Sequence, residues 1–285
     1  MILLIFLLVD SLMLFLVTLK IGLFWTTSFI FVYYTLNYIR GSHLSGVDTF
    51  DLLRSLPFWK MLHRVKLRIT DLERINDDTR YVVLLYPNYT NNALIWAFGL
   101  HGDRKMNRLR LCYLMPWIMF YVPLLREILL LSGAVSAEGN VEDRVIEMIR
   151  KGRNVVYCPT GMEDVLYVHE GNEIRPKKPT MNFYTKAAEN GYEILPTLCL
   201  GETDGKYFFV TSEYVRIAQE WILKKIGHPA LLLYFFANSK KDIDVTVGES
   251  VTCHKRTPHD IQEDVNKTLV HVNTTVYDKK LSFAK

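Results

Sequence analysis

The chain has 285 residues, of which 49% are hydrophobic and 22% charged, with a formal net charge of +4. This composition excludes a disordered or fibrous protein, and the length allows one large domain or a modest domain with an appendage. Lys and Arg form no long run, and there is no zinc-ligand spacing or phosphate-binding loop, so nucleic acid is not an expected partner. The weak positive charge suits an anionic membrane surface or an acidic substrate equally well.

The first 39 residues contain two apolar stretches, 1–19 and 21–39, and the only charges in this region are Asp10 and, between the stretches, Lys20. Each stretch has the length of a membrane-spanning helix. A cleaved signal peptide is the competing interpretation, but it requires a basic start, and this chain begins Met-Ile-Leu-Leu. We therefore predict a membrane-embedded helical hairpin over residues 1–39, either as two spans or as one span and one embedded helix.

Basic residues follow the second apolar stretch, which predicts that the rest of the chain faces the cytosol. Residues 40–285 are accordingly predicted to form one cytosolic α/β domain. On this topology the three N-x-S/T sequons, at Asn88, Asn266 and Asn273, carry no glycan. The basic residues of the flank are Arg40, Arg54, Lys60, Arg64, Lys66 and Arg68.

Strand-like and helix-like segments alternate along this domain. Continuous apolar runs indicate buried strands, and an apolar residue every three or four positions indicates an amphipathic helix. Gly152 and Gly191 are expected to end helices. The predicted elements are strands at 81–86, 154–158, 193–199, 231–235 and 243–247, and helices at 142–151, 181–190 and 258–277.

This alternation predicts a mainly parallel sheet flanked by helices on both faces. Ligand sites in such sheets lie at the carboxyl ends of strands, so the segments after residues 86, 158 and 199 are expected to form the site. The four cysteines (Cys112, Cys158, Cys199 and Cys253) are far apart and lack metal-ligand spacing. We predict that they are core residues in a reducing compartment.

Three stretches of the chain resemble the type 2 diacylglycerol and monoacylglycerol acyltransferases. Residues 122–134 are similar to the family's Met-Pro-Val-Leu-Arg-Glu…Gly-Gly block. Residues 191–202 resemble Gly-Ala-Asp-Leu-Val-Pro…Phe-Gly-Glu, and residues 245–251 resemble Val-Val-Gly-Glu-Pro-Ile. The order and spacing of the blocks agree over residues 76–280.

The resemblance implies a glycerolipid acyltransferase-like fold and transfer of a fatty acyl group from acyl-CoA to the hydroxyl of a mono- or diacylglycerol or related lipid alcohol. It implies an endoplasmic reticulum membrane protein with a cytosolic domain, and the lipid droplet surface is a second expected location. The expected partners are acyl-CoA, the acceptor lipid and membrane lipid. The resemblance is also compatible with a homo-oligomer and with association with other lipid-synthesis enzymes. No metal and no cofactor besides the substrate acyl-CoA are expected.

The family's His-Pro-His-Gly motif aligns with Tyr86-Pro87-Asn88-Tyr89, so both histidines are replaced. The amide of Asn88 can position a hydroxyl group, but it does not accept a proton near neutral pH. Loss of general-base help costs about a hundredfold to ten-thousandfold in rate. The resemblance therefore leaves two hypotheses: an O-acyltransferase with an altered site, or an inactive relative that binds lipid or partners an active acyltransferase.

Two further family blocks supply candidate residues. Gly-Gly-Ala-x-Glu aligns with residues 160–164, which places Asp164 at the glutamate position with Gly161 and Glu163 beside it. Arg-Lys-Gly-Phe aligns with residues 180–183, where the positive charges are missing. Lys177 and Lys178, just upstream, are candidates for contacting the CoA phosphates instead.

The remaining candidates each have two interpretations. His101 is either a relocated base or a solvated or capping residue. Arg126 either contacts a substrate head group or forms an ion pair with Glu127. Glu202 follows a predicted strand and either faces the pocket or binds a loop. The aromatic stretch 113–121 either contacts lipid or packs in the core.

His43 and Asp48 have the His-x4-Asp spacing of the wider glycerolipid acyltransferase group, but His259 and Asp264 repeat it in a predicted terminal helix, so the spacing is weak evidence. The candidate catalytic residues are thus Asn88, His101 and Asp164. The candidate substrate-binding residues are Tyr86, Pro87, Tyr89, Arg126, Gly161, Glu163, Lys177, Lys178 and Glu202.

Overall fold

A computed structural model describes most of the α/β domain and one N-terminal helix. The described residues are 13–14, 22–40, 65–69, 75–76, 78–86, 98–99, 108–122, 125–159, 178–200, 217–218, 221–222, 225 and 243–277.

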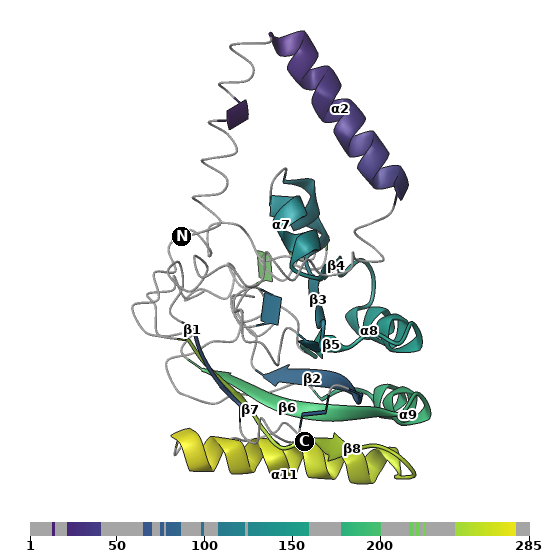
Figure 1. The fold of residues 1–285 in the computed structure, drawn as a ribbon, viewed down its shortest axis with the longest axis vertical. Helices are drawn as coiled ribbons and strands as arrows, with labels where there is room; N and C mark the ends of the chain where they lie inside the picture. Colours follow the sequence, from purple (N-terminus) through teal and green to yellow (C-terminus); the bar gives the residue numbers. More distant parts are fainter. Residues whose placement is uncertain are drawn as a thin grey trace.

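Eight strands within these ranges form a single sheet, in the order β1-β7-β6-β2-β5-β3-β4, with β8 paired to β6 (Figure 1). Five neighbouring pairs are parallel, and β7 and β8 both run antiparallel to β6, so the predicted mainly parallel sheet is confirmed. The strands are β1 (Val65–Ile69), β2 (Arg80–Tyr86), β3 (Cys112–Met115), β4 (Ala134–Ser136), β5 (Val155–Tyr157), β6 (Tyr192–Leu200), β7 (Ile243–Val247) and β8 (Val251–Thr252).

Both faces of this sheet are buried beneath helices. Side chains alternate along β2, so that Tyr81, Val83 and Leu85 face one apolar cluster while Val82, Leu84 and Tyr86 face the other. The first cluster includes residues of α7 (Leu125–Leu131) and the 3-10 helix η3 (Trp117–Tyr121). The second includes residues of α8 (Val141–Arg150), α9 (Met181–Glu189) and α11 (Pro258–Tyr277), and α11 runs beneath β6 and β8 in Figure 1.

Polar side chains begin the two helices that lead into β5 and β6. Asn140 Oδ1 accepts a hydrogen bond from the backbone N–H of Glu142 at 2.9 Å at the start of α8. Thr180 Oγ1 accepts from the N–H of Phe183 at 3.4 Å at the start of α9. Gly191, with a φ of 69°, follows α9 in the left-handed conformation that a glycine adopts without strain. The helices predicted at 142–151 and 181–190 are confirmed to within one residue at each end.

The aromatic stretch at 113–121 forms β3 and η3. Tyr113 is fully buried, and its hydroxyl hydrogen-bonds to Ser132 Oγ at 2.5 Å. Only Tyr121 in this stretch is exposed, so core packing describes most of these side chains. All four cysteines are buried and free, as expected from the sequence.

The second N-terminal apolar stretch forms α2 (Leu23–Arg40), which stands apart from the sheet in Figure 1. Of the first stretch, only residues 13–14 are described, so the hairpin over residues 1–39 stays a prediction. In the part of the chain that is described, no helix is both long enough and apolar enough to cross a membrane. The strand predicted at 231–235 lies outside the described residues.

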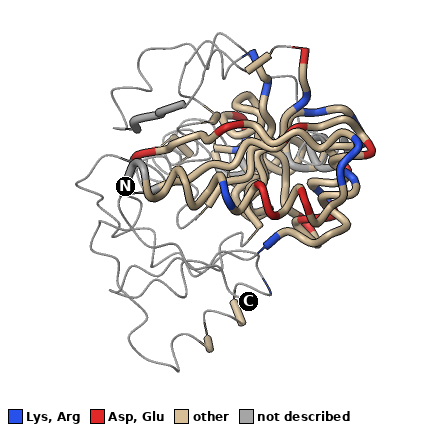
Figure 2. The backbone as a smooth tube through the Cα atoms, turned by 90° about the horizontal axis from the view of Figure 1, so that it is seen from below, with Lys and Arg blue, Asp and Glu red and all other residues tan. Residues whose placement is uncertain are grey.

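Charged residues of both signs are interspersed along the described backbone (Figure 2). Many of them form short-range ion pairs on helix surfaces. In α8, for example, Glu147 pairs with both Arg144 and Lys151, and the Lys151 Nζ lies 2.7 Å from the carboxylate. Such exposed pairs contribute only about 0.3–0.5 kcal/mol each, so the buried clusters provide most of the stability.

A β-bulge separates β7 from β8 opposite Pro196 of β6. Val247 pairs with Thr197 and Val251 pairs with Ile194, so three residues, 248–250, oppose the two residues 195–196. At this point the N–H of Gly248 donates to the Pro196 carbonyl at 2.7 Å. Because of the bulge, residues 243–252 pair with β6 both before and after Pro196.

Replacing Gly248 with alanine is expected to destabilise this bulge. A Cβ at residue 248 would lie 2.8 Å from Thr268 Cγ2 and 3.0 Å from Val272 Cγ2 of α11. We expect Gly248→Ala to lower the free energy of unfolding by about 1–3 kcal/mol, as for other overpacked sites. Thermal unfolding of the full chain measures the change.

The double variant Gly248→Ala/Thr268→Ser is the matched control, because serine lacks the methyl group nearest to the new Cβ. The loss caused by Gly248→Ala should be smaller in the Thr268→Ser background. Equal losses in both backgrounds would show that the clash with the Thr268 methyl group is not the cause.

Candidate functional site

The sheet brings the three predicted loops to one edge. β2 lies between β5 and β6 and is parallel to both. Leu84 is opposite Tyr157, and Tyr86 is opposite Leu198, so the three strands end close together. The carboxyl ends of these three strands therefore lie at the same edge of the sheet. This is the place where a parallel α/β sheet binds its ligand.

Most of the predicted site residues belong to those segments and lie outside the described residues. The undescribed candidates are Pro87, Asn88, Tyr89, His101, Gly161, Glu163, Asp164, Lys177 and Glu202. Their predicted roles stay predictions. Tyr86, Arg126 and Lys178 are described.

Tyr86 is the last residue of β2 and is 2% exposed. Its ring belongs to the apolar cluster that β2 shares with α8, α9 and α11. Tyr86 therefore helps to fix the end of β2 by packing, whichever contacts the loop after it makes. Lys178 is half-buried and lies two residues before Thr180, which caps α9.

Arg126 lies in the first turn of α7 and is 3% exposed. Its Nη1 donates to Glu127 Oε1 at 2.6 Å, and its guanidinium carbon is 5.9 Å from the centre of the Tyr33 ring of α2. The Tyr33 hydroxyl also donates to Glu127. These contacts match the ion-pair interpretation of Arg126 and join α2 to α7. Contact with a substrate head group stays a prediction.

A second polar cluster at the carboxyl edge was not predicted. Glu142, in the first turn of α8, accepts hydrogen bonds from the Tyr157 hydroxyl at 2.9 Å and from the Thr180 N–H at 3.0 Å. The Thr180 hydroxyl donates to the other carboxylate oxygen. Burial, and then the nearby Glu142 carboxylate, raise the pKa of Tyr157 well above its usual value, so its hydroxyl stays protonated and remains a donor.

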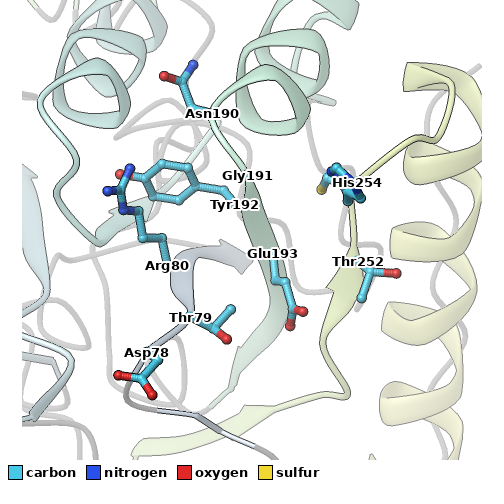
Figure 3. A pocket seen from close by; sticks show the side chains of 10 residues that line it. Asp78, Thr79, Arg80, Asn190, Gly191, Tyr192, Glu193, Thr252 and His254 are labelled. Atoms are coloured by element: carbon cyan, nitrogen blue, oxygen red, sulfur yellow. The ribbon is translucent and has the colours of Figure 1, made fainter.

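The opposite, amino edge of the sheet contains an open pocket of about 350 Å³. It is lined by the first residues of β2 and β6 and the last residue of β8, together with their neighbours (Figure 3). In Figure 3 the side chain of Arg80 lies beside Tyr192, whereas Glu193 and Thr252 lie on the other side of β6. The charged side chains of Arg80 and Glu193 therefore do not point toward one another. The pocket is thus separate from the predicted site, at the far ends of the same strands.

The described structure defines an α/β protein whose candidate site is built at the carboxyl ends of β2, β5 and β6. The sequence matches the family model described as diacylglycerol acyltransferase over residues 28–279, which includes most of α2 and the whole described sheet. The chain therefore belongs to the diacylglycerol acyltransferase family.

Two relatives, one from mouse and one from human, are both named acyl-CoA wax alcohol acyltransferase 2. The mouse protein is 21% identical over 193 residues, which are 64% of this chain and 56% of the mouse protein. The human protein is 22% identical over 188 residues, which are 62% of this chain and 55% of the human protein. The matched region thus spans little more than half the length of these relatives.

Among solved structures, the 1-acyl-sn-glycerophosphate acyltransferase PlsC from Thermotoga maritima aligns with a TM-score of 0.49 and 11% identity, covering 98% of each chain.

The pocket at the amino edge is expected to lack a reactive thiol, although Cys253 lines it. Cys253 is fully buried, and burial raises its pKa to about 12. At pH 8 about one thiol in ten thousand would then be ionised, and the thiolate is the reactive form. We expect no alkylation of Cys253 by iodoacetamide at pH 8 in the folded chain, measured by mass spectrometry of its peptides.

Unfolding in guanidinium chloride is the control, because it should expose all four cysteines to the reagent. Rapid labelling of Cys253 in the folded chain would contradict its burial.

Proposed function

We propose that this protein is an acyl-CoA-dependent O-acyltransferase that transfers a fatty acyl group to the hydroxyl of a neutral lipid. The family match over residues 28–279 carries the proposal, because it includes all three strands whose carboxyl ends meet and the loops that follow them. The two relatives, which are named as acyltransferases, support the reaction type.

The reaction requires three events at the carboxyl edge. The acceptor hydroxyl oxygen attacks the thioester carbonyl carbon, and the hydroxyl proton passes to a base. The attack forms the C–O bond of the ester. The tetrahedral oxyanion then collapses, so that the carbonyl double bond re-forms, the C–S bond breaks and the CoA thiolate takes up the proton from the base. Hydrogen-bond donors stabilise the oxyanion. We assign the proton acceptor to Asp164 or His101, and positioning of the hydroxyl to Asn88.

The acceptor is proposed to be a mono- or diacylglycerol. This proposal rests on the family description, diacylglycerol acyltransferase. The names of the mouse and human relatives add a second acceptor class, long-chain alcohols. Both classes present a hydroxyl next to a long apolar chain, so one assay panel covers them.

The alternative is an inactive family member that binds lipid or partners an active acyltransferase. It is favoured by the segment Tyr86-Pro87-Asn88-Tyr89, which replaces the two histidines of the family motif. A protein that keeps the sheet but lacks the motif histidines could still bind lipid without catalysing acyl transfer.

Membranes containing the full chain are expected to incorporate labelled oleoyl-CoA into neutral lipid when supplied with a mono- or diacylglycerol or a long-chain alcohol. Asp164→Asn, which removes the proton acceptor but preserves shape, should lower the rate about a hundredfold to ten-thousandfold if Asp164 is the base. His101→Ala should have that effect if His101 is the base. Thin-layer chromatography of the labelled lipids measures the products.

A variant that restores the family motif, Asn88→His with Tyr89→Gly, separates the two functions. An inert wild-type chain together with a revertant that turns over would establish the binding-protein alternative. Turnover by the wild-type chain that survives both Asp164→Asn and His101→Ala would exclude these residues as the base.

We further propose that the chain is attached to the endoplasmic reticulum membrane, and in part to lipid droplets, with residues 40–285 in the cytosol. Large apolar side chains of α2 support this proposal, because Trp25, Phe29 and Phe31 are 65%, 71% and 71% exposed. Exposed aromatic residues of this size are typical of surfaces that contact lipid or another protein. An acceptor lipid would then reach the site from the same membrane.

A cytosolic domain is expected to carry no N-linked glycan, so endoglycosidase treatment of the cellular protein should leave its gel mobility unchanged. Asn273 is 1% exposed in α11, so a glycan there is also incompatible with the packed helix. A version with an added cleavable signal peptide serves as the positive control. A mobility shift of the unmodified chain would overturn the proposed topology.

A further inference from the structure

We propose that Glu142 is a positioning residue that holds together the two ends of the segment carrying the acidic block and the lysine pair. The segment runs from Tyr157, at the end of β5, to Thr180, at the start of α9. It contains Glu163 and Asp164 as well as Lys177 and Lys178. The role of these residues in acyl transfer rests on the proposed function, whereas the anchoring by Glu142 does not.

Both ends of the segment are bound by a single carboxylate. Glu142 Oε2 accepts from the Tyr157 hydroxyl at 2.9 Å and from the Thr180 N–H at 3.0 Å, and Oε1 accepts from the Thr180 hydroxyl. An ionised carboxylate has only acceptors, so it suits three donors at once. The first turn of α8, where Glu142 lies, also favours a negative charge because of the helix dipole.

The packing around the carboxylate fixes its position. The rings of Tyr157 and Phe183 have their centres 5.0 Å apart, and both residues are buried. The side chain of Asn140 holds the first turn of α8 by accepting from the N–H of Glu142. The Thr180 hydroxyl has a second partner, since it accepts from the N–H of Phe183 while donating to Glu142. The carboxylate is thus part of a hydrogen-bonded junction between α8, β5 and α9.

Chain length limits how far the candidate residues of the segment can lie from its two described ends. Asp164 is seven residues past Tyr157, which allows at most about 23–25 Å of extended chain. Lys178 is two residues before Thr180, which allows about 7 Å. Tying the ends also reduces the conformations that a segment of this length must lose to adopt one arrangement. Loss of the Glu142 contacts is therefore expected to widen the range of positions open to the segment between Tyr157 and Thr180.

The test compares Glu142→Gln with Asp143→Asn in the full chain. The glutamine amide places an N–H group where an acceptor is needed, so contacts with Thr180 or Tyr157 are lost. Asp143 lies in the same turn of α8 and is exposed, so its variant removes the same charge without touching this junction. Thr180→Val and Thr180→Ser form a second pair, in which only serine retains the hydroxyl.

Trypsin provides a readout that is independent of activity. Arg175 and Lys178 each precede a proline, so the bond between Lys177 and Lys178 is the one tryptic site between residues 154 and 180. Cleavage at this bond under native conditions is expected to be at least fivefold faster in Glu142→Gln and Thr180→Val than in the wild type. Asp143→Asn and Thr180→Ser should remain near the wild-type rate. Unchanged cleavage in both Glu142→Gln and Thr180→Val overturns the proposal.

Two measurements test whether the Glu142 contacts affect CoA binding. They are the Kd of the fluorescent probe 1,N6-etheno-CoA and the KM for oleoyl-CoA. We expect Glu142→Gln to raise the Kd of the probe and the KM at least fivefold, with a smaller effect on kcat. Faster cleavage with an unchanged Kd would make Glu142 a structural residue only and overturn its positioning role. A wild-type chain that binds no etheno-CoA would instead refute the proposed function, and the trypsin rates would still decide the anchoring.

Discussion

The structure depends on the parallel hydrogen-bonded ladder that β2 forms with β5 on one side and β6 on the other. Leu84 stands opposite Tyr157 of β5 and Pro196 of β6, so a single register fixes where all three strands end. Both faces of β2 are covered by apolar clusters, which makes any shift of that register costly because it would move buried side chains to the wrong face. The positions of α8 and α9, and hence the junction at Glu142, follow from this register.

The sequence predicted the elements that this ladder joins, for a physical reason. Strands buried on both faces are mostly apolar, so 81–86 stood out as a continuous apolar run and 193–199 as a run interrupted only by Glu193 and Thr197. Helices that end at Gly152 and Gly191 were equally clear. Strand order was not predictable, because the local pattern of β7 is the same whichever neighbour it has. Its antiparallel pairing with β6 depends on the bulge opposite Pro196, a contact between residues about fifty positions apart.

The place of the site was predictable and its supporting contacts were not. Parallel strands bring their carboxyl ends together, so the edge followed from the fold class alone. Tyr86 was assigned to substrate from its place in a motif, but its burial gives it a packing role at the end of β2. In the sequence, Glu142 was interpreted as one of several charges on the solvent face of an amphipathic helix. Its partners, Tyr157 and Thr180, are 15 and 38 residues away, and no local pattern marks such a cluster.

Loss of the motif histidines and retention of the sheet affect different parts of the free-energy barrier. A missing base costs about a hundredfold to ten-thousandfold, whereas orienting two bound reactants contributes independently of any proton transfer. Under the proposed function, the ladder of β5, β2 and β6 supplies that orientation, because it brings three strand ends to one edge. If Glu142 also holds the two ends of the segment that carries the lysine pair, one carboxylate supports the proposed CoA contacts. Affinity for CoA then depends on this junction more than turnover does, so an inactive relative that still binds CoA needs Glu142 as much as an active enzyme does.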